Sequence, residues 1–465
     1  GGTCRHRRRP ARLMASQAGT RPPDAGADRH RAIEDLELRL QRTPKAVRPH
    51  EHAALAYRLG LAHAESPEGS PEAGLRKALA YYDVAAAIFD PRFDPIEHAR
   101  VLNGAGAARR ALGDRAKAAE LFERAAGLLE GHERDDERAA VLNNLGLVLA
   151  ELGRLDLAVA ACDQAVDLFD TATPEGRRGR VATLHSRGMA HAATGTEEGL
   201  EAALADHRRA ASELDPEEAP YHQGLVQHSL GATYSALAGL RPEERPRLLR
   251  EAVSAFQESL MVFTRTAFPF QYALVKHNLG LAWAGLGGTA NLRRALTCFE
   301  DAVAVFDSRV HADAWRQSYA SLERTDKELA ERAPGLSRAD HFVALLASAA
   351  PDERLALIRE RLTRMLTLPA ENRRLLTELA LASGRLGYDG ALAVMESELS
   401  VLIELPTEQL DAGLRARFDA HRRLESEDAR ENADRALDQA VGNALQGPQR
   451  IAVRDFLYSL GWERP

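Results

Sequence analysis

Residues 138–170 read "RAAVLNNLGLVLAELGRLDLAVAACDQAVDLFD", and this stretch decides the fold. Apolar residues recur every three or four positions on both sides of Gly153. That period is typical of amphipathic α-helices, and a glycine between two such runs is typical of the turn that ends the first helix. The stretch is either one hairpin of a compact domain or one unit of an array. Recurrence of its pattern elsewhere in the chain distinguishes the two.

The second predicted helix carries Ala158, Cys162, Ala165 and Phe169 at relative positions 0, 4, 7 and 11. These positions lie on one helical stripe, where two small residues allow a close neighbour and a ring between them fills the gap. Five other stretches have the same spacing: Ala78-Tyr82-Ala85-Phe89, Ala118-Phe122-Ala125-Leu129, Ala203-His207-Ala210-Leu214, Ala252-Phe256-Ser259-Phe263 and Ala295-Phe299-Ala302-Phe306. The sequence therefore predicts an array of six helix pairs.

Each copy also has a glycine in its first helix. The six glycines are Gly60, Gly106, Gly146, Gly188, Gly231 and Gly280. Five of them follow an apolar residue, and Arg187 is the exception. A glycine inside a helix costs about 1 kcal/mol relative to alanine, so its recurrence indicates that another helix comes close at this point.

These residues resemble the tetratricopeptide repeat (TPR) family, which has a glycine in helix A followed by alanine, an aromatic residue and alanine in helix B. The distances from Gly106 to Ala118 and from Gly146 to Ala158 match the family, while the other four copies have longer A–B connections. The long period is similar to that of kinesin light chains and of bacterial TPR arrays that accompany caspase-like or ATPase regulators, especially in "FPFQYALVKHNLGLAWAGLG" at 268–287. The resemblance covers about residues 50–333.

The predicted fold is all-α, a TPR solenoid of six repeats followed by a separate α-helical domain. Residues 1–22 are expected to be a disordered basic leader, and 23–49 an initial helix with a linker. Residues 50–335 are expected to hold the array and its end helix, and 336–465 the C-terminal helical domain. Whether residues 1–13 belong to the native product is left open, because Met14 opens a second plausible start.

Composition limits the function. Hydrophobic residues make up 45% of the chain and aromatic residues 5%, so the core is built mainly from alanine and leucine. Residues 1–22 carry six Arg and no acid, and the rest carries 55 basic and 68 acidic side chains. Such an acidic body is a poor nucleic-acid binder. No stretch reaches the roughly 18–20 apolar residues of a membrane span. Three cysteines without a CxxC pair favour a reducing cytoplasm.

The candidate binding residues lie two and three positions before each glycine of helix A. In the resembled family this part of helix A lines a concave groove, where asparagine side chains pair with the backbone of an extended peptide. An amide suits this task because it both donates and accepts. The resemblance thus implies a peptide or partner site made of Asn103, Asn143, Asn144, His185, His228, His277 and Asn278.

The three histidines of this set allow two interpretations. They form either a ladder of donors for an acidic ligand, with binding that strengthens below about pH 6.5, or ordinary polar residues of the groove. One metal ion cannot bridge them, because neighbouring helices are about 10 Å apart and metal–ligand bonds are about 2 Å long. We expect no metal and no cofactor, and the polar-groove interpretation is favoured.

For other polar groups both a structural and a functional interpretation are considered. His50, Glu51 and His52 are a solvated helix start or a metal site. "ERDDE" at 133–137 is a favourable helix N-terminus or an acidic docking patch. Cys162 and His207 occupy the position that holds a ring in four other copies, so they are packing residues, or alternatively a reactive thiol and a catalytic base. In each case the structural interpretation is favoured.

The predicted function is that of a cytoplasmic bacterial adaptor or scaffold that binds a protein or peptide along the concave face of the array. The first alternative is an enzyme whose site lies between the C-terminal domain and the array, with Asp340, His341, Glu371, Tyr388 and Asp389 available. Against it, the sequence has no GxxxxGK[ST], GxSxG or HExxH motif. A regulator that switches partners with a small ligand is a third alternative. Oligomerisation is left open.

Overall fold

The computed structural model describes residues 25–462 except 66–69, 216, 218 and 367–372. Within these residues the regular elements are helices without a strand, so the all-α prediction is confirmed. The predicted leader, residues 1–22, lies outside them, as does Glu371.

The chain is divided into two units, Gly1–Ala282 and Trp283–Pro465. The division falls inside one helix, α12 (Pro269–Leu286), which carries the first half of the predicted sixth repeat. The second helix of that repeat and the predicted end helix thus belong to the same unit as the C-terminal helices. The boundary at 335/336 stays a prediction.

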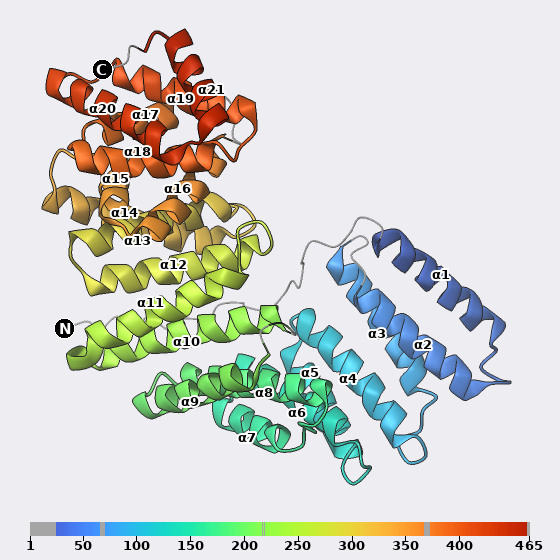
Figure 1. The fold of residues 1–465 in the computed structure, drawn as a ribbon. Helices are drawn as coiled ribbons and strands as arrows, with labels where there is room; N and C mark the ends of the chain where they lie inside the picture. The colour runs from blue at the N-terminus through green and yellow to red at the C-terminus, as the bar shows by residue number, and fades with distance from the viewer. Residues whose placement is uncertain (1–24, 66–69, 216, 218, 367–372, 463–465) are drawn as a thin grey trace. The chain divides into compact units, whose positions relative to one another are not determined.

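The first unit consists of α1 followed by alternating A and B helices (Figure 1). Helix α1 (Ala25–Arg42), expected as the initial helix, packs on α2 through a cluster that contains Ile33, Leu36, Leu55 and Leu59. The A helices are α2 (Pro49–Ala64), α4 (Pro95–Ala111), α6 (Asp135–Glu151), α8 (Pro174–Ala193), α10 (Pro220–Leu240) and α12. The B helices of this unit are α3 (Pro71–Ala86), α5 (Arg115–Leu128), α7 (Leu155–Val166), α9 (Glu197–Glu213) and α11 (Arg245–Val262), with the 3₁₀ helix η1 (Pro242–Glu244) before α11.

Local sequence explains where the A helices begin and end. Five of the six A helices start with proline, which has no N–H to leave unpaired and a backbone angle that suits the first turn. The sixth, α6, starts instead with Asp135, Asp136 and Glu137, which favour the positive end of the helix dipole. Gly113 and Gly153 follow α4 and α6 with φ of +89° and +76°, a conformation that other residues rarely adopt. Gly153 is thus the predicted turn.

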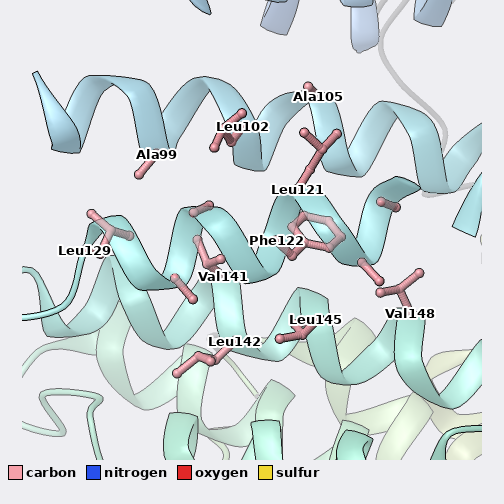
Figure 2. Packing of buried hydrophobic residues seen from close by; sticks show 14 of the residues in the cluster. Ala99, Leu102, Ala105, Leu121, Phe122, Leu129, Val141, Leu142, Leu145 and Val148 are labelled. Carbon is pink, nitrogen blue, oxygen red and sulfur yellow. The ribbon is translucent and has the colours of Figure 1, made fainter. Parts of the chain in front are cut away.

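Inside each repeat the glycine of helix A lies against the second stripe residue of helix B. A Cβ placed on Gly106 would lie 2.7 Å from Cε1 of Phe122, which Figure 2 shows among the buried side chains of α4, α5 and α6. The same contact is found in five repeats: Gly60 with Tyr82, Gly106 with Phe122, Gly146 with Cys162, Gly188 with His207 and Gly231 with Phe256. The predicted close approach of another helix is confirmed in these repeats.

We expect Gly106→Ala to destabilise the protein by about 1–3 kcal/mol, because the added methyl group overlaps the Phe122 ring. Gly127→Ala is the matched control: Gly127 is also in a helix, but nothing lies within 4 Å of its added Cβ. There the better helix propensity of alanine should stabilise by up to about 1 kcal/mol. Urea denaturation followed by circular dichroism measures both. Equal effects of the two substitutions would contradict the helix contact.

In the part of the second unit that the structure describes, nine further helices follow α12. They are α13 (Thr289–Val305), α14 (Ala312–Arg332), α15 (Arg338–Ser348), α16 (Pro351–Leu366), α17 (Arg373–Gly384), α18 (Tyr388–Leu402), α19 (Thr407–His421), α20 (Glu427–Ala444) and α21 (Gly447–Ser459). Phe299 of α13 packs with Leu322 and Leu329 of α14. A second cluster joins α15 to α19, and a third joins α18 to α21 around Leu437 and Trp462.

Ion pairs connect α13 to α16. Arg294 of α13 donates to Glu353 of α16 at 3.0 Å, and Arg361 of α16 donates to Glu300 of α13 at 2.5 Å. The Arg361 guanidinium also lies 4.2 Å from the centre of the Phe342 ring of α15. These contacts explain why α13 is part of the second unit and not of the first.

Candidate functional site

The A helices form the inner side of the first unit. Helices α2, α4, α6, α8 and α10 each contact their own B helix, and successive members of this series also contact one another directly. The hydrogen bond between Asn278 and His228 joins α12 to α10. Within the described residues, successive B helices of this unit have no contact of similar extent. The A helices therefore lie closer together than the B helices do, and a stack with this property curves with its A helices inside.

The predicted site residues form one row across these inner helices. Helix α4 carries Asn103, α6 carries Asn143 and Asn144, α8 carries His185, α10 carries His228, and α12 carries His277 and Asn278. His185 is buried, and the other six are half-buried. We call these seven residues, together with Ser186 of α8 and Ser229 of α10, the inner row.

Hydrogen bonds connect the inner row from one repeat to the next. In each case a residue three positions before the glycine pairs with a residue two positions before the next glycine. Asn144 Nδ2 donates to Asn103 Oδ1 at 3.0 Å. His185 Nε2 and Ser229 Oγ are 2.8 Å apart, and Asn278 Nδ2 donates to His228 Nε2 at 2.8 Å. These pairs fix the orientation of the side chains on the inner face.

The row is interrupted at the third repeat. There Asn143 would be expected to pair with Ser186 of the fourth, but the Ser186 hydroxyl donates to the carbonyl oxygen of Ala182 at 2.8 Å. The Asn143 Oδ1 atom is buried without a hydrogen-bond partner. A buried acceptor without a partner costs about 1–3 kcal/mol, so this position favours a donor supplied from outside the chain.

A glycine takes the place of a polar residue at the first step of the row. A Cβ on Gly104 would lie 2.8 Å from Cζ of Tyr82, the ring that also lies against Gly60. Tyrosine is longer than the phenylalanine of other repeats and reaches the next A helix. Gly104 is therefore required by the Tyr82 ring.

His185 and His228 of the inner row are neutral at neutral pH. Burial lowers the pKa of both His185 and His228 to about 4. The hydrogen bond from Asn278 leads to the same conclusion for His228, because an Nε2 atom that accepts carries no proton. The ladder of charged donors that strengthens below pH 6.5 is therefore disfavoured, and the polar-groove interpretation agrees better with this geometry.

Cys162 and His207 are packing residues in the structure. Both are almost fully buried, at 0% and 1% exposure, against the helix A glycines of their repeats. Burial raises the pKa of the Cys162 thiol to about 12 and lowers the pKa of His207 to about 3. A thiol that stays protonated is a poor nucleophile.

Arg187, the exception among the residues before the glycines, belongs to an ion network beside this pair. Its guanidinium donates to both carboxylate oxygens of Asp206 at 3.0 and 2.5 Å, and to Asp163 of the preceding repeat at 2.7 Å. Asp206 precedes His207 in α9, and Asp163 follows Cys162 in α7. The third and fourth repeats thus combine small or polar stripe residues with an inter-repeat ion network.

The other N-terminal candidates have separate partners. His50 Nε2 lies 3.1 Å from Asp94 Oδ1, whereas His52 Nδ1 lies 2.7 Å from the carbonyl oxygen of Thr43. Within 133–137, Glu137 binds Arg100 through two hydrogen bonds of 2.7 Å. The two histidines therefore do not converge, and part of the acidic segment is used to join α4 to α6.

The residues named for the enzyme alternative also have structural partners. Asp340 caps α15 through Ser337 and pairs with Arg385 at 3.2 Å. His341 is buried, the Tyr388 ring lies under the guanidinium of Arg435 at 5.2 Å, and Asp389 is exposed. These described residues do not share one cleft.

A different set of polar side chains converges in the second unit. Arg361, Ser383, Glu398 and Arg417 line a cavity of about 30 Å³ between α15 and α19, and Arg417 pairs with Glu398. That volume holds one or two water molecules. The sequence signal for these residues is a polar side chain on an otherwise apolar stripe, which does not identify its partner. The cavity fits bound water better than a substrate.

Repeated α-hairpins with a polar inner row define a helical-repeat protein. Residues 139–170 match the family model described as tetratricopeptide repeat. This match shows a tetratricopeptide repeat at residues 139–170, and the same motif recurs in the other helix pairs of the array. The likeness to kinesin light chains stays a resemblance. No curated protein matches the sequence.

Several solved structures are similar to this chain at low identity. A tetratricopeptide repeat protein from Parabacteroides merdae has 15% identity and a TM-score of 0.40, with 63% of this chain and 93% of that one covered. Yeast Tom70 has 13% identity and a TM-score of 0.21, covering 90% and 96%. The c5321 protein, a protective antigen of uropathogenic Escherichia coli with an SLR fold, has 14% identity and a TM-score of 0.20, covering 89% and 98%.

Within the described residues, no helix combines the length and the apolar character that crossing a membrane requires.

Proposed function

We propose that this protein is an adaptor that binds an extended segment of a partner protein on the inner face of its A helices. The observation that supports the proposal is the inner row, in which polar side chains are paired from repeat to repeat and present amide and imidazole groups on one face. The repeat fold is typical of protein-binding scaffolds.

Pairing within the row prepares it for a ligand. A side chain that is already held in one orientation loses less conformational freedom when a peptide binds, which improves the free energy of association. Each amide keeps unused capacity: Asn144 donates from Nδ2 to Asn103, and its Oδ1 oxygen is a separate acceptor. Hydrogen bonds worth about 1 kcal/mol each would give modest affinity that tolerates different partner sequences.

The unpaired side-chain oxygen of Asn143 also supports the proposal. Its Oδ1 atom is buried and has no partner within the protein. A backbone N–H of a bound segment would satisfy it, and the cost of leaving it unpaired would then be recovered on binding. Water is the competing donor, and the experiment below distinguishes the two.

We expect Asn144→Ala combined with Asn278→Ala to weaken partner binding about tenfold or more while changing stability by less than about 1 kcal/mol per site. Both side chains are half-buried, so water replaces the amide toward Asn103 and His228. The matched control is Gln164→Ala with Gln257→Ala, which removes two exposed amides from B helices. Thermal melts and titration of a captured partner measure the two effects.

The test begins with affinity capture from the source cells. The wild type, the Asn103, Asn144 and Asn278 triple-alanine variant, and the glutamine control are compared by mass spectrometry. Overlapping synthetic peptides that cover the sequence of a captured protein are then prepared. The binding of each peptide is measured by titration with fluorescence anisotropy. Binding of one peptide to wild type and control but not to the triple variant supports the proposal. A partner that all three hold equally would place the binding site elsewhere and refute it.

The compartment and the domain organisation belong to the same proposal. A cytoplasmic adaptor is supported by the buried thiol of Cys162, which a reducing compartment keeps reduced. We propose that the array ends near residue 335 and that 336–465 has a role of its own. A bacterial source is consistent with a strong preference for arginine, since only five of the 61 basic residues are lysine.

A further inference from the structure

The inner face differs between the two halves of the array. Helical spacing places on this face the residues six, three and two positions before each helix A glycine, and the residues one and five positions after it. In α2, α4 and α6 this set includes Arg58, Arg100 and Glu151, and Glu65 at the end of α2. In α8, α10 and the first-unit part of α12 it consists of Ala182, His185, Ser186, Met189, Ala193, Leu225, His228, Ser229, Ala232, Ala236, Leu274, His277, Asn278 and Leu281, without a Lys, Arg, Asp or Glu.

In α8 from Val181 onward, in α10 and in α12, the charged side chains have partners away from this face. Arg187 is bound to Asp206 and Asp163, and Lys276 is buried with its Nζ 5.3 Å from the centre of the Tyr272 ring. His185 and His228 add no charge, because His228 accepts a hydrogen bond at Nε2 and His185 is buried. The positions named above in α8, α10 and α12 therefore carry no Lys, Arg, Asp or Glu side chain.

Apolar side chains lie on both sides of the polar pairs. Leu225 and Leu274 are half-buried six positions before the glycines of α10 and α12. On the other side, one position after the glycines, Met189 is half-buried and Leu281 is 44% exposed. A bound chain could thus place its backbone on the polar pairs and its apolar side chains against these residues.

From this arrangement we propose that the inner face of α8, α10 and α12 binds an extended segment of a partner protein whose side chains are uncharged and mainly apolar. The inference rests on the proposed function and adds the chemistry of the partner. A charged side chain buried against this face would lose hydration and gain no opposite charge, which costs several kcal/mol. An uncharged segment avoids that cost and gains the burial of apolar surface.

The size of the segment follows from the spacing of the helices. Neighbouring helices are about 10 Å apart and an extended chain rises about 3.3 Å per residue, so about three residues span one step of the row. Three helices then accommodate about nine residues. A bound main chain finds an acceptor in the Asn278 oxygen and a donor in the second ring nitrogen of His228, whose proton must be on Nδ1.

The test is selection from a fully randomised nonapeptide display library on the full-length protein. We expect the selected peptides to be depleted of Asp, Glu, Lys and Arg. Synthetic copies should bind with dissociation constants that change less than about twofold between 50 and 500 mM NaCl, since screening acts only on charge. Peptides that are charged, with binding that weakens strongly in salt, would overturn this inference and leave the proposed adaptor standing.

Two exposed alanines give matched variants. Ala232 of α10 and Ala107 of α4 each follow their helix A glycine by one position. Ala232→Glu should weaken binding of the selected peptides at least tenfold, and Ala107→Glu less than about twofold. Circular dichroism checks that both variants fold. Equal weakening would overturn the assignment to the second half of the array. A library that yields no binder at all would overturn the proposed function, and this inference with it.

Discussion

We expect Phe122→Ala to lower the free energy of unfolding by about 3–5 kcal/mol. Phe122 is 1% exposed and its ring lies against Gly106 of its own repeat. Figure 2 shows it among Ala105, Leu145 and the other buried residues of α4 and α6. Alanine would remove the ring and leave a cavity that rigid helices on three sides cannot close.

The measurement is urea denaturation followed by circular dichroism at 222 nm. Phe93→Ala is the matched control, because it removes the same atoms from a side chain that is 80% exposed in the connection between α3 and α4. That substitution should change stability by no more than about 0.5 kcal/mol. If Phe122→Ala and Phe93→Ala gave the same small effect, the stripe would not be the packing element of the repeat.

The stripe could be predicted because its determinants are local. Spacings of four and seven residues define one face of a helix, whatever surrounds it. A glycine that recurs opposite a ring reports a contact within one repeat, as Gly106 and Phe122 show. The polarity of the inner row was likewise visible, since Asn144 and Asn278 stand at equivalent positions.

What the sequence did not indicate depends on contacts between repeats. The partner of Asn144 is 41 residues away and that of Asn278 is 50 residues away, and both distances vary with the length of the connecting segments. The loss of charge at His185 follows from burial that several helices create together. Pairing and pKa are therefore properties of the stack and not of a single motif.

The same limit applied in the second unit. Arg361 looks like an exposed residue of an amphipathic helix, yet it is 8% exposed and pairs with Glu300, 61 residues earlier. Residues that the sequence offered as catalytic, such as Asp340, cap or join helices instead. A polar side chain on an apolar stripe predicts a buried partner, but only the packing of α13 against α16 identifies it.

The second large effect is a loss of stability in mild acid. His185 and His207 are buried, and their pKa values are lowered to about 4 and about 3, against about 6.5 in an unfolded chain. Between these limits the unfolded chain binds protons that the folded chain does not, so stability falls as pH falls below 6.5. Above pH 6.5 both states are neutral at these positions, and the effect is absent.

Each such histidine lowers the free energy of unfolding by about 1.4 kcal/mol for each pH unit of decrease within that window. His228, whose pKa is also lowered to about 4, acts in the same way, so the three histidines together should lower the free energy of unfolding by up to about 4 kcal/mol per pH unit between pH 6 and 5. The titratable groups that act on His207 are His185 and His191, and Asp206 precedes it in α9. Its buried Nδ1 atom has no hydrogen-bond partner within the described residues, so a proton on this atom would not be stabilised by a hydrogen bond.

His207→Phe tests this explanation. Phenylalanine stands at the equivalent position of the second and fifth repeats, against Gly106 and Gly231, and Gly188 provides the same space here. We expect the variant to be more stable than wild type, with a pH slope between 6 and 5 that is smaller by about 1.4 kcal/mol per unit. His132→Gln, at an exposed position, should leave the slope unchanged. If His207 is neutral in the folded state, its removal must reduce the pH dependence of the free energy of unfolding. An unchanged pH dependence in His207→Phe would mean that the acid sensitivity arises from other groups.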